Sequence, residues 1–244
     1  MLKMEEQEWV IYAKELFNNL YTEQRILQAK KDILDRPKMD VEYSRGGILI
    51  DRGYHCRSMA YDLYITNVKR GKLLKKAPRK APDYAYYYKD DILTLASKYP
   101  NQKNEVIEHI QWNGNVESSI LLTPTLSKAE WPQICVATLN QNETLEKNTM
   151  CTFFMDDQEI RGFDLCAEEY IYDDCLKECR LIYVSAMKMC KMVYLRSAEI
   201  RYTYHEDRTP KGYFLDSHTG YCTGTEYPLP EPVKAMMNQK IKHP

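Results

Sequence analysis

Glycine and long apolar runs are both scarce in this chain of 244 residues, and their scarcity excludes several classes of protein. The chain contains only 9 glycines, and neither the G-x-G-x-x-G fingerprint nor the G-x-x-x-x-G-K-[ST] phosphate loop occurs. Rossmann dehydrogenases and nucleotide-driven motors are therefore not expected. No apolar run approaches the roughly 18 residues of a transmembrane helix. The N-terminus has no basic stretch followed by an apolar one, so we expect a chain that is cytoplasmic or otherwise intracellular, not secreted.

The composition is that of a globular protein with an unusual set of aromatic residues. Hydrophobic residues make up 44% and charged residues 28%, a balance that disordered, collagen-like and coiled-coil chains do not have. Tyrosine outnumbers phenylalanine 20 to 5, so most aromatic side chains carry a hydroxyl that needs water or a partner. The 8 cysteines of a chain that is not expected to be secreted are predicted to be free thiols.

The pattern of apolar residues predicts an α+β fold, a mostly antiparallel sheet flanked by two long helices. Residues 5–34 lack Gly and Pro and have apolar positions near a helical period, which predicts one long helix or two joined near Tyr21-Thr22. A second long helix is expected over 164–197, which also lacks Gly and Pro. Short β-rich runs at 118–123, 134–139 and 150–155 predict strands, and 200–205 with 213–216 resemble a closing hairpin. Asp90-Asp91 are expected to cap a short helix that ends near Lys98.

We expect one domain that spans residues 1–244. Its predicted parts are an N-terminal helical segment (1–36), a mainly β region that carries a basic arm (41–160), a long helix followed by the hairpin (164–227), and a peripheral tail (228–244).

The formal net charge of −1 conceals two blocks of opposite sign. Residues 69–80, the basic arm, contain seven basic and no acidic side chains. Residues 156–178 contain nine acidic and two basic side chains. If 164–197 is a helix, its acids gather near the N-terminus and its bases near the C-terminus, as the helix dipole favours. Either the two blocks meet within the fold or between subunits, or the basic arm is free to bind a partner.

The basic arm and the tyrosines that follow it are typical of a surface that binds nucleic acid. Basic side chains neutralise phosphates, and aromatic rings stack on bases. The predicted contact residues are Lys69, Arg70, Lys72, Lys75, Lys76, Arg79, Lys80, Tyr86 and Tyr87. The leading hypothesis is a non-catalytic intracellular interaction protein, of cellular, phage or viral origin, that binds nucleic acid or an acidic protein without a cofactor. A structural alternative is a solvated hairpin tip whose lysines keep a sheet edge from pairing with other chains.

A second hypothesis is enzymatic and starts from the string His55-Cys-Arg-Ser-Met-Ala60-Tyr-Asp62. The string resembles the zinc peptidases of the D-Ala-D-Ala dipeptidase and carboxypeptidase group, whose Ser-x-His-x-x-Gly-x-Ala-x-Asp motif supplies a His and an Asp as zinc ligands. His55, Ala60 and Asp62 are in register, whereas Gly53 and Ser58 replace the Ser and the Gly of the motif. The resemblance implies a zinc site formed by His55, Asp62 and His109, which leaves one coordination position open for water.

The general base of this implied site would be Glu105 or Glu108, at a spacing that differs from the group's pattern. A third hypothesis is a structural subunit of a larger assembly, with which a tyrosine-rich surface and oligomerisation are both compatible. No membrane partner is expected under any of the three hypotheses.

Overall fold

A computed structural model describes residues 4–59, 69–122, 132–156, 159–173, 175–189, 192–204 and 210–220 of the chain. Within these residues there are two α-helices, two short 3-10 helices and twelve β-strands. The helices are α1 (Met4–Leu20), α2 (Glu23–Asp35), η1 (Arg36–Lys38) and η2 (Gly53–His55). The strands are β1 (Asp40–Arg45), β2 (Lys72–Leu73), β3 (Tyr84–Lys89), β4 (Ile92–Lys98), β5 (Val106–Asn113), β6 (Val116–Leu122), β7 (Gln133–Leu139), β8 (Leu145–Asp156), β9 (Glu159–Tyr172), β10 (Leu176–Met189), β11 (Met192–Tyr204) and β12 (Pro210–Gly220).

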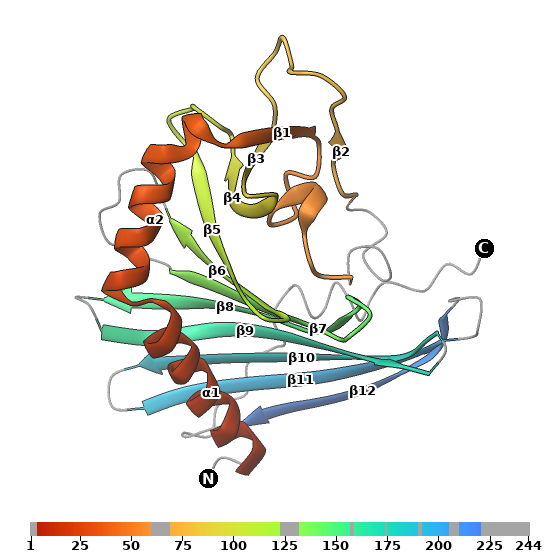
Figure 1. Cartoon of the computed structure of the whole chain (residues 1–244). Coiled ribbons are helices and arrows are strands. Elements are labelled where there is room, and N and C mark those ends of the chain that lie inside the picture. Colours follow the sequence, from red (N-terminus) through yellow and green to blue (C-terminus); the bar gives the residue numbers. More distant parts are fainter. Residues whose placement is uncertain are drawn as a thin grey trace.

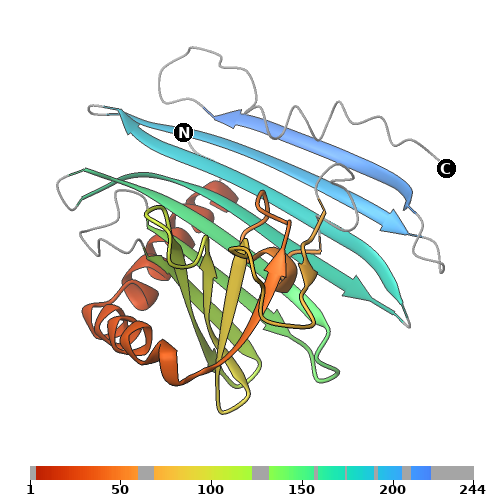
Figure 2. The ribbon, with the colours of Figure 1, turned by 90° about the horizontal axis from the view of Figure 1, so that it is seen from above.

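The twelve strands of the described residues form one antiparallel sheet in the order β12-β11-β10-β9-β8-β7-β6-β5-β4-β3-β1-β2. From β3 to β12, each strand pairs with the next one along the chain. β1 lies beside β3, and the short strand β2 pairs with β1 at the edge. The sheet twists strongly, so that β3–β6 run at a large angle to β10–β12 (Figure 2).

The two α-helices lie across one face of the sheet (Figures 1 and 2). α1 turns Ala13 and Leu16 inward, and α2 contributes Ala29. These side chains share a core with residues of β6–β10 such as Phe153 and Leu165, which are fully buried. Burial of each large apolar side chain contributes about 1.5–3 kcal/mol, so this layer is the main source of stability.

The opposite face of the sheet is covered in part by residues 46–59, which we call the covering segment; it follows β1 and contains η2 (Figure 2). Tyr84 and Tyr86 of β3 point to this side. Their hydroxyls donate hydrogen bonds to the carbonyls of Ile50 at 2.7 Å and Arg52 at 3.0 Å. Because much of the sheet is covered on both faces, its central strands bury residues at successive positions as well as at alternate ones.

The long helix predicted over 164–197 is wrong, because this stretch forms most of β9, all of β10 and the first part of β11. β9 pairs antiparallel with β10, and β10 with β11. The prediction depended on the absence of Gly and Pro, but a chain without these residues can form a strand as well as a helix. Burial on both faces removed the alternation that would have indicated strands: Leu181, Ile182 and Val184 are all buried.

The charges of this stretch form cross-strand ion pairs and do not follow a helix dipole. Arg180 of β10 contacts Glu169 of β9 at 3.2 Å and Glu199 of β11 at 2.8 Å. Lys147 of β8 contacts the same Glu169 at 3.2 Å. Part of the acidic block is therefore neutralised within the sheet, by residues outside the basic arm.

The N-terminal segment contains two short helices and not one long helix. α1 has 17 residues and α2 has 13, and they are separated at Tyr21-Thr22, which is the second of the two predicted alternatives. The Thr22 side chain explains the break, because it accepts a hydrogen bond from the backbone N–H of Arg25 at 3.3 Å and caps the new helix.

Asp90 and Asp91 form a turn and do not cap a helix. Their φ angles of 51° and 63° match the two central residues of a type I′ turn, which here connects β3 to β4. The short helix predicted to end near Lys98 is therefore wrong. The strands predicted at 118–123, 134–139 and 150–155 correspond to β6, β7 and β8, and the predicted closing hairpin is confirmed as β11 and β12.

Candidate polyanion-binding arm

The basic arm, residues 69–80, lies between the covering segment and β3 and projects beyond the end of the sheet (Figure 1). Near its start, Lys72 pairs with Arg45 of β1. Near its end, the Arg45 guanidinium donates a hydrogen bond to the Lys80 carbonyl at 3.3 Å. β1 therefore holds both ends of the arm, and residues 75–79 form its tip.

A close approach of two backbone segments fixes the base of the arm. Gly46 and Gly47 adopt φ angles of 82° and 72°, and a Cβ added to Gly47 would lie 2.5 Å from the backbone nitrogen of Gly71. Only glycine avoids this clash in such a conformation. Asp83 secures the returning side, because its Oδ2 accepts a hydrogen bond from the Gly46 N–H at 2.7 Å.

Arg70 is a structural residue at the base of the arm. Its guanidinium donates hydrogen bonds to the carbonyls of Cys56 and Ser58, and a longer one of 3.4 Å to the Tyr54 carbonyl. These bonds tie the arm to the covering segment. The guanidinium therefore has a role in the fold, which distinguishes Arg70 from the other predicted contact residues.

The other six cations of the basic arm are exposed to solvent. They are Lys69, Lys72, Lys75, Lys76, Arg79 and Lys80. In the described part of the chain, none of the six has an acidic partner within ion-pair distance. Apart from its basic residues, the arm contains only uncharged residues and adds no acidic group. The arm thus concentrates six positive charges that no acidic side chain of the described residues neutralises.

Tyr86 and Tyr87, which were predicted to stack on bases, are buried at 0% and 9% exposure. The Tyr86 hydroxyl lies 3.0 Å from Ser44 Oγ and accepts a hydrogen bond from the Tyr54 N–H at 3.1 Å. Tyr87 packs in the apolar cluster that includes Leu95. These rings support β3 from its two faces and have no free surface on which a base can stack.

A buried ionic cluster lies beneath the covering segment, and sequence reasoning did not identify it as a unit. Arg52 donates to Glu108 through two nitrogens, at 3.0 and 2.6 Å, and also contacts Glu117. Arg57 contacts the second oxygen of Glu117 at 2.7 Å. Burial alone would lower the pKa of Arg52, but Glu108 and Glu117 raise it well above its ordinary value, so the guanidinium stays charged.

The signal that could have found this cluster is the placement of polar residues on one face of β5 and β6. Glu108 shares its face with Ile110, which is buried, and Glu117 shares its face with Ser119. A carboxylate at a buried strand position requires a cationic partner or a hydrogen-bond donor. The partner, Arg52, lies in a turn more than fifty residues away, at a φ of 63°, which no local pattern indicates.

A second buried carboxylate has hydrogen-bond donors around it. Glu168 of β9 accepts hydrogen bonds from Ser58 at 2.5 Å, Tyr170 at 2.6 Å and Asn148 at 3.2 Å. Burial raises its pKa, and the three donors and Arg70 oppose this rise. The Tyr170 hydroxyl also accepts from the Met59 N–H at 3.1 Å. This cluster fastens the end of the covering segment to the sheet.

The structure places His55 and His109, two of the predicted zinc ligands, on opposite faces of the sheet. The His55 ring packs against Tyr86, with 4.5 Å between ring centroids, and its Nε2 lies 3.1 Å from the Tyr88 hydroxyl. His109 is buried under α2, where its Nε2 lies 3.0 Å from Asp32 Oδ2.

The strand ladders show why the two histidines are separated. Leu95 of β4 pairs with His109 on one side and with Tyr87 on the other, so these three share the helix face. Tyr86 is the neighbour of Tyr87 and therefore faces the other way. The third predicted ligand, Asp62, and the matched Ala60 lie outside the described residues. Among the described residues, no group of three or more His, Cys, Asp or Glu is arranged to bind a metal ion.

The two candidate general bases are also engaged elsewhere. Glu105 accepts hydrogen bonds from Ser97 at 2.5 Å and Arg36 at 2.8 Å, and Glu108 holds Arg52. The described geometry therefore gives no support to a zinc peptidase site.

Comparison with known proteins finds no matching family model, no similar curated protein and no similar solved structure. Neither of the described α-helices has the length and apolar character needed to cross a membrane.

Proposed function

We propose that this chain is a non-catalytic interaction protein whose basic arm binds the phosphate backbone of nucleic acid. The single observation that carries the proposal is the set of six exposed cations on the projecting arm, none of which has an acidic partner among the described residues. Phosphates along a nucleic-acid strand offer charges at regular, short intervals, and binding releases condensed counterions.

The buried tyrosines change the expected mode of binding. Because Tyr86 and Tyr87 are buried, the arm has contacts for phosphates and lacks the stacking surface that selects unpaired bases. We therefore expect binding that depends little on sequence and that favours a duplex, whose charge density is higher.

The test is a salt titration of binding to a fluorescent 20-base-pair duplex, measured by anisotropy. With up to six phosphate contacts, the logarithm of the association constant should fall with the logarithm of salt concentration at a slope of about −5. In the variant with Lys72, Lys75, Lys76, Arg79 and Lys80 all changed to Ala, we expect at least a hundredfold weaker binding near 0.1 M salt and a slope close to −1.

The matched control removes the same charge elsewhere. Lys14, Lys38, Lys103, Lys147 and Lys177 are all exposed and lie outside the arm. Their combined change to Ala should leave most of the affinity and the slope in place. Equal losses in the two variants would show that net charge, and not the arm, governs binding, and would overturn the proposal.

Two further probes separate nucleic acid from an acidic protein. A single strand of the same length should bind more weakly than the duplex, and poly-glutamate of equal charge should compete poorly. If poly-glutamate competes as well as the duplex, the arm is a site for acidic proteins and the nucleic-acid proposal fails.

A further inference from the structure

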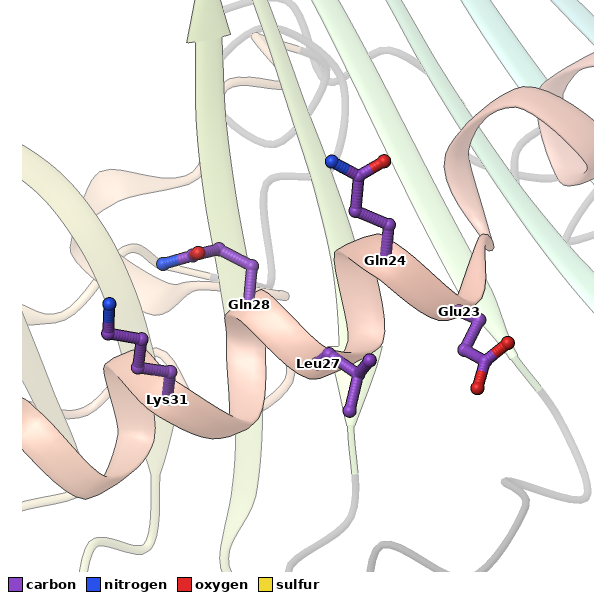
Figure 3. Close-up of a pocket in the computed structure, with 5 residues that line it drawn as sticks. All are labelled: Glu23, Gln24, Leu27, Gln28 and Lys31. Atoms are coloured by element: carbon purple, nitrogen blue, oxygen red, sulfur yellow. The ribbon is translucent and has the colours of Figure 1, made fainter.

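The outer face of α2 carries an exposed stripe that faces away from the sheet (Figure 3). Leu27 and Leu34 are 57% and 79% exposed, and Glu23, Gln24 and Lys31 are exposed beside them. At 3.6 residues per turn, Glu23, Leu34, Leu27 and Lys31 fall within about 80° of the helix circumference. Glu23, Gln24, Leu27, Gln28 and Lys31 line a shallow hollow on this face (Figure 3).

We infer that this stripe is a dimer interface, in which α2 of a second copy of the chain crosses it antiparallel at Leu27. The charges on the stripe are the reason for choosing a second copy as the partner. Glu23 and Lys31 lie the same number of residues before and after Leu27, one helical turn to either side.

A twofold axis at Leu27 makes this arrangement complementary to itself. The axis brings the two Leu27 side chains together and places Glu23 of each copy at the level of Lys31 of the other, so that two opposite-charge pairs form at once. In the described part of the chain, neither Glu23 nor Lys31 has an ion-pair partner within the monomer. The exposed Leu34 of each copy extends the apolar contact, so that the twofold axis places one such leucine at either end of the interface.

The size of the stripe sets the strength of the dimer. A helix of 13 residues is about 20 Å long, so two such helices bury well under the roughly 1,600 Å² of a standard stable interface. We therefore expect a weak, reversible dimer with a dissociation constant on the order of 10–100 μM, and not an obligate one.

Sedimentation velocity of the full chain from about 1 to 500 μM tests this inference. The weight-average sedimentation coefficient of the wild type should rise from the monomer value toward that of a dimer. Leu27→Glu should abolish the rise, because it removes the central apolar contact and sets two carboxylates against each other.

Charge exchange tests the antiparallel geometry. Glu23→Lys alone and Lys31→Glu alone each convert two attractive contacts into two repulsive ones, and each should raise the dissociation constant by about tenfold. The double variant Glu23→Lys with Lys31→Glu should return it to within about threefold of the wild-type value. The matched control is Lys103→Glu, an exposed charge reversal in the turn before β5, which should have no effect.

Three results would overturn the inference: a wild type that stays monomeric to 500 μM, a dimer that persists in Leu27→Glu, or a double exchange that behaves like the single ones. All four positions are exposed, so the variants should fold, and circular dichroism with thermal melting checks this for each. The interface is independent of the basic arm, so that loss of nucleic-acid binding would leave it intact.

Discussion

At the scale of single residues, the fold depends on a few buried polar groups that join distant segments. Arg52 is the main one, since it holds Glu108 and Glu117 while sitting in a left-handed turn of the covering segment. Arg70 and Glu168 fasten the same segment at two further points. These contacts place the base of the basic arm on the sheet, although none of them is part of the proposed binding surface.

Removal of Arg52 should therefore be costly. Arg52→Ala leaves two carboxylates in a buried site with one partly exposed cation, Arg57, to neutralise them. The expected loss is about 3–5 kcal/mol in the free energy of unfolding, measured by urea denaturation. Arg57→Ala is the matched comparison, because Arg57 is more exposed, and it should cost at most about 1–2 kcal/mol. Equal losses in the two variants would contradict the central role of Arg52.

At the scale of elements, the sequence predicts strands well where a β-rich run of residues is short and lies between turn residues. It predicts them poorly where the run is long. β6, β7 and β8 are flanked by Pro, Asn or charged turn residues, which mark their ends. The sequence between β9 and β10 and between β10 and β11 contains no Gly to mark the strand ends. Both faces of β9 and β10 contain buried residues, so no local pattern separates these strands from a helix.

The same limits apply to the predicted binding site. Exposure of the arm lysines follows from their charge and could be predicted, and so could their clustering. Burial of Tyr86 and Tyr87 could not, because it arises from the covering segment on one side and α2 on the other, which are both distant in sequence. The placement of His55 and His109 on opposite faces likewise depends on two things that the sequence does not display, the strand register that turns His109 toward α2 and the packing of the covering segment that carries His55.

A glycine substitution in the turn at Asp90-Asp91 distinguishes a hairpin from a helix over residues 89–98, because the expected change in stability has opposite signs in the two cases. In a type I′ turn both central residues have positive φ, where glycine is strain-free, so Asp91→Gly should stabilise the protein by up to about 1 kcal/mol. Within a helix the same change would destabilise it by about 1 kcal/mol. Thermal and urea unfolding measure the difference. A lower stability of Asp91→Gly would contradict the hairpin of β3 and β4.

At the scale of the whole molecule, the small net charge results from two different arrangements. Glu169 of β9 is neutralised by Arg180 and Lys147 across the sheet, so its charge contributes to the fold. In the described part of the chain, the six exposed cations of the basic arm lie outside such pairs and contribute to the surface. This division explains how a chain of net charge −1 can still present a strongly positive arm to a partner.

Two buried glutamates should make the stability of the whole molecule depend on pH in opposite directions. Burial alone would raise the pKa of Glu117, but Arg52 and Arg57 lower it below the ordinary value near 4.5. The negative charge of Glu117 therefore stabilises the folded state fully above about pH 4.5, and this stabilisation is lost as the pH falls through the lowered pKa. Burial raises the pKa of Glu168, so the folded state holds that proton more tightly than the unfolded chain, and stability declines as pH rises from about 4.5 through the raised value.

Glu168→Gln isolates the second effect. The amide oxygen can accept from Tyr170 and Asn148, and the amide nitrogen can donate to Ser58, so the contacts are kept and only the buried charge is removed. Measured by urea unfolding between pH 4 and pH 8, the stability of the variant relative to the wild type should increase as pH rises. Glu146→Gln is the control, because it makes the same chemical change at an exposed position of β8 and leaves the buried carboxylate of Glu168 in place. A difference between Glu168→Gln and the wild type that stays constant over this range would show that Glu168 does not hold its proton more tightly in the folded chain.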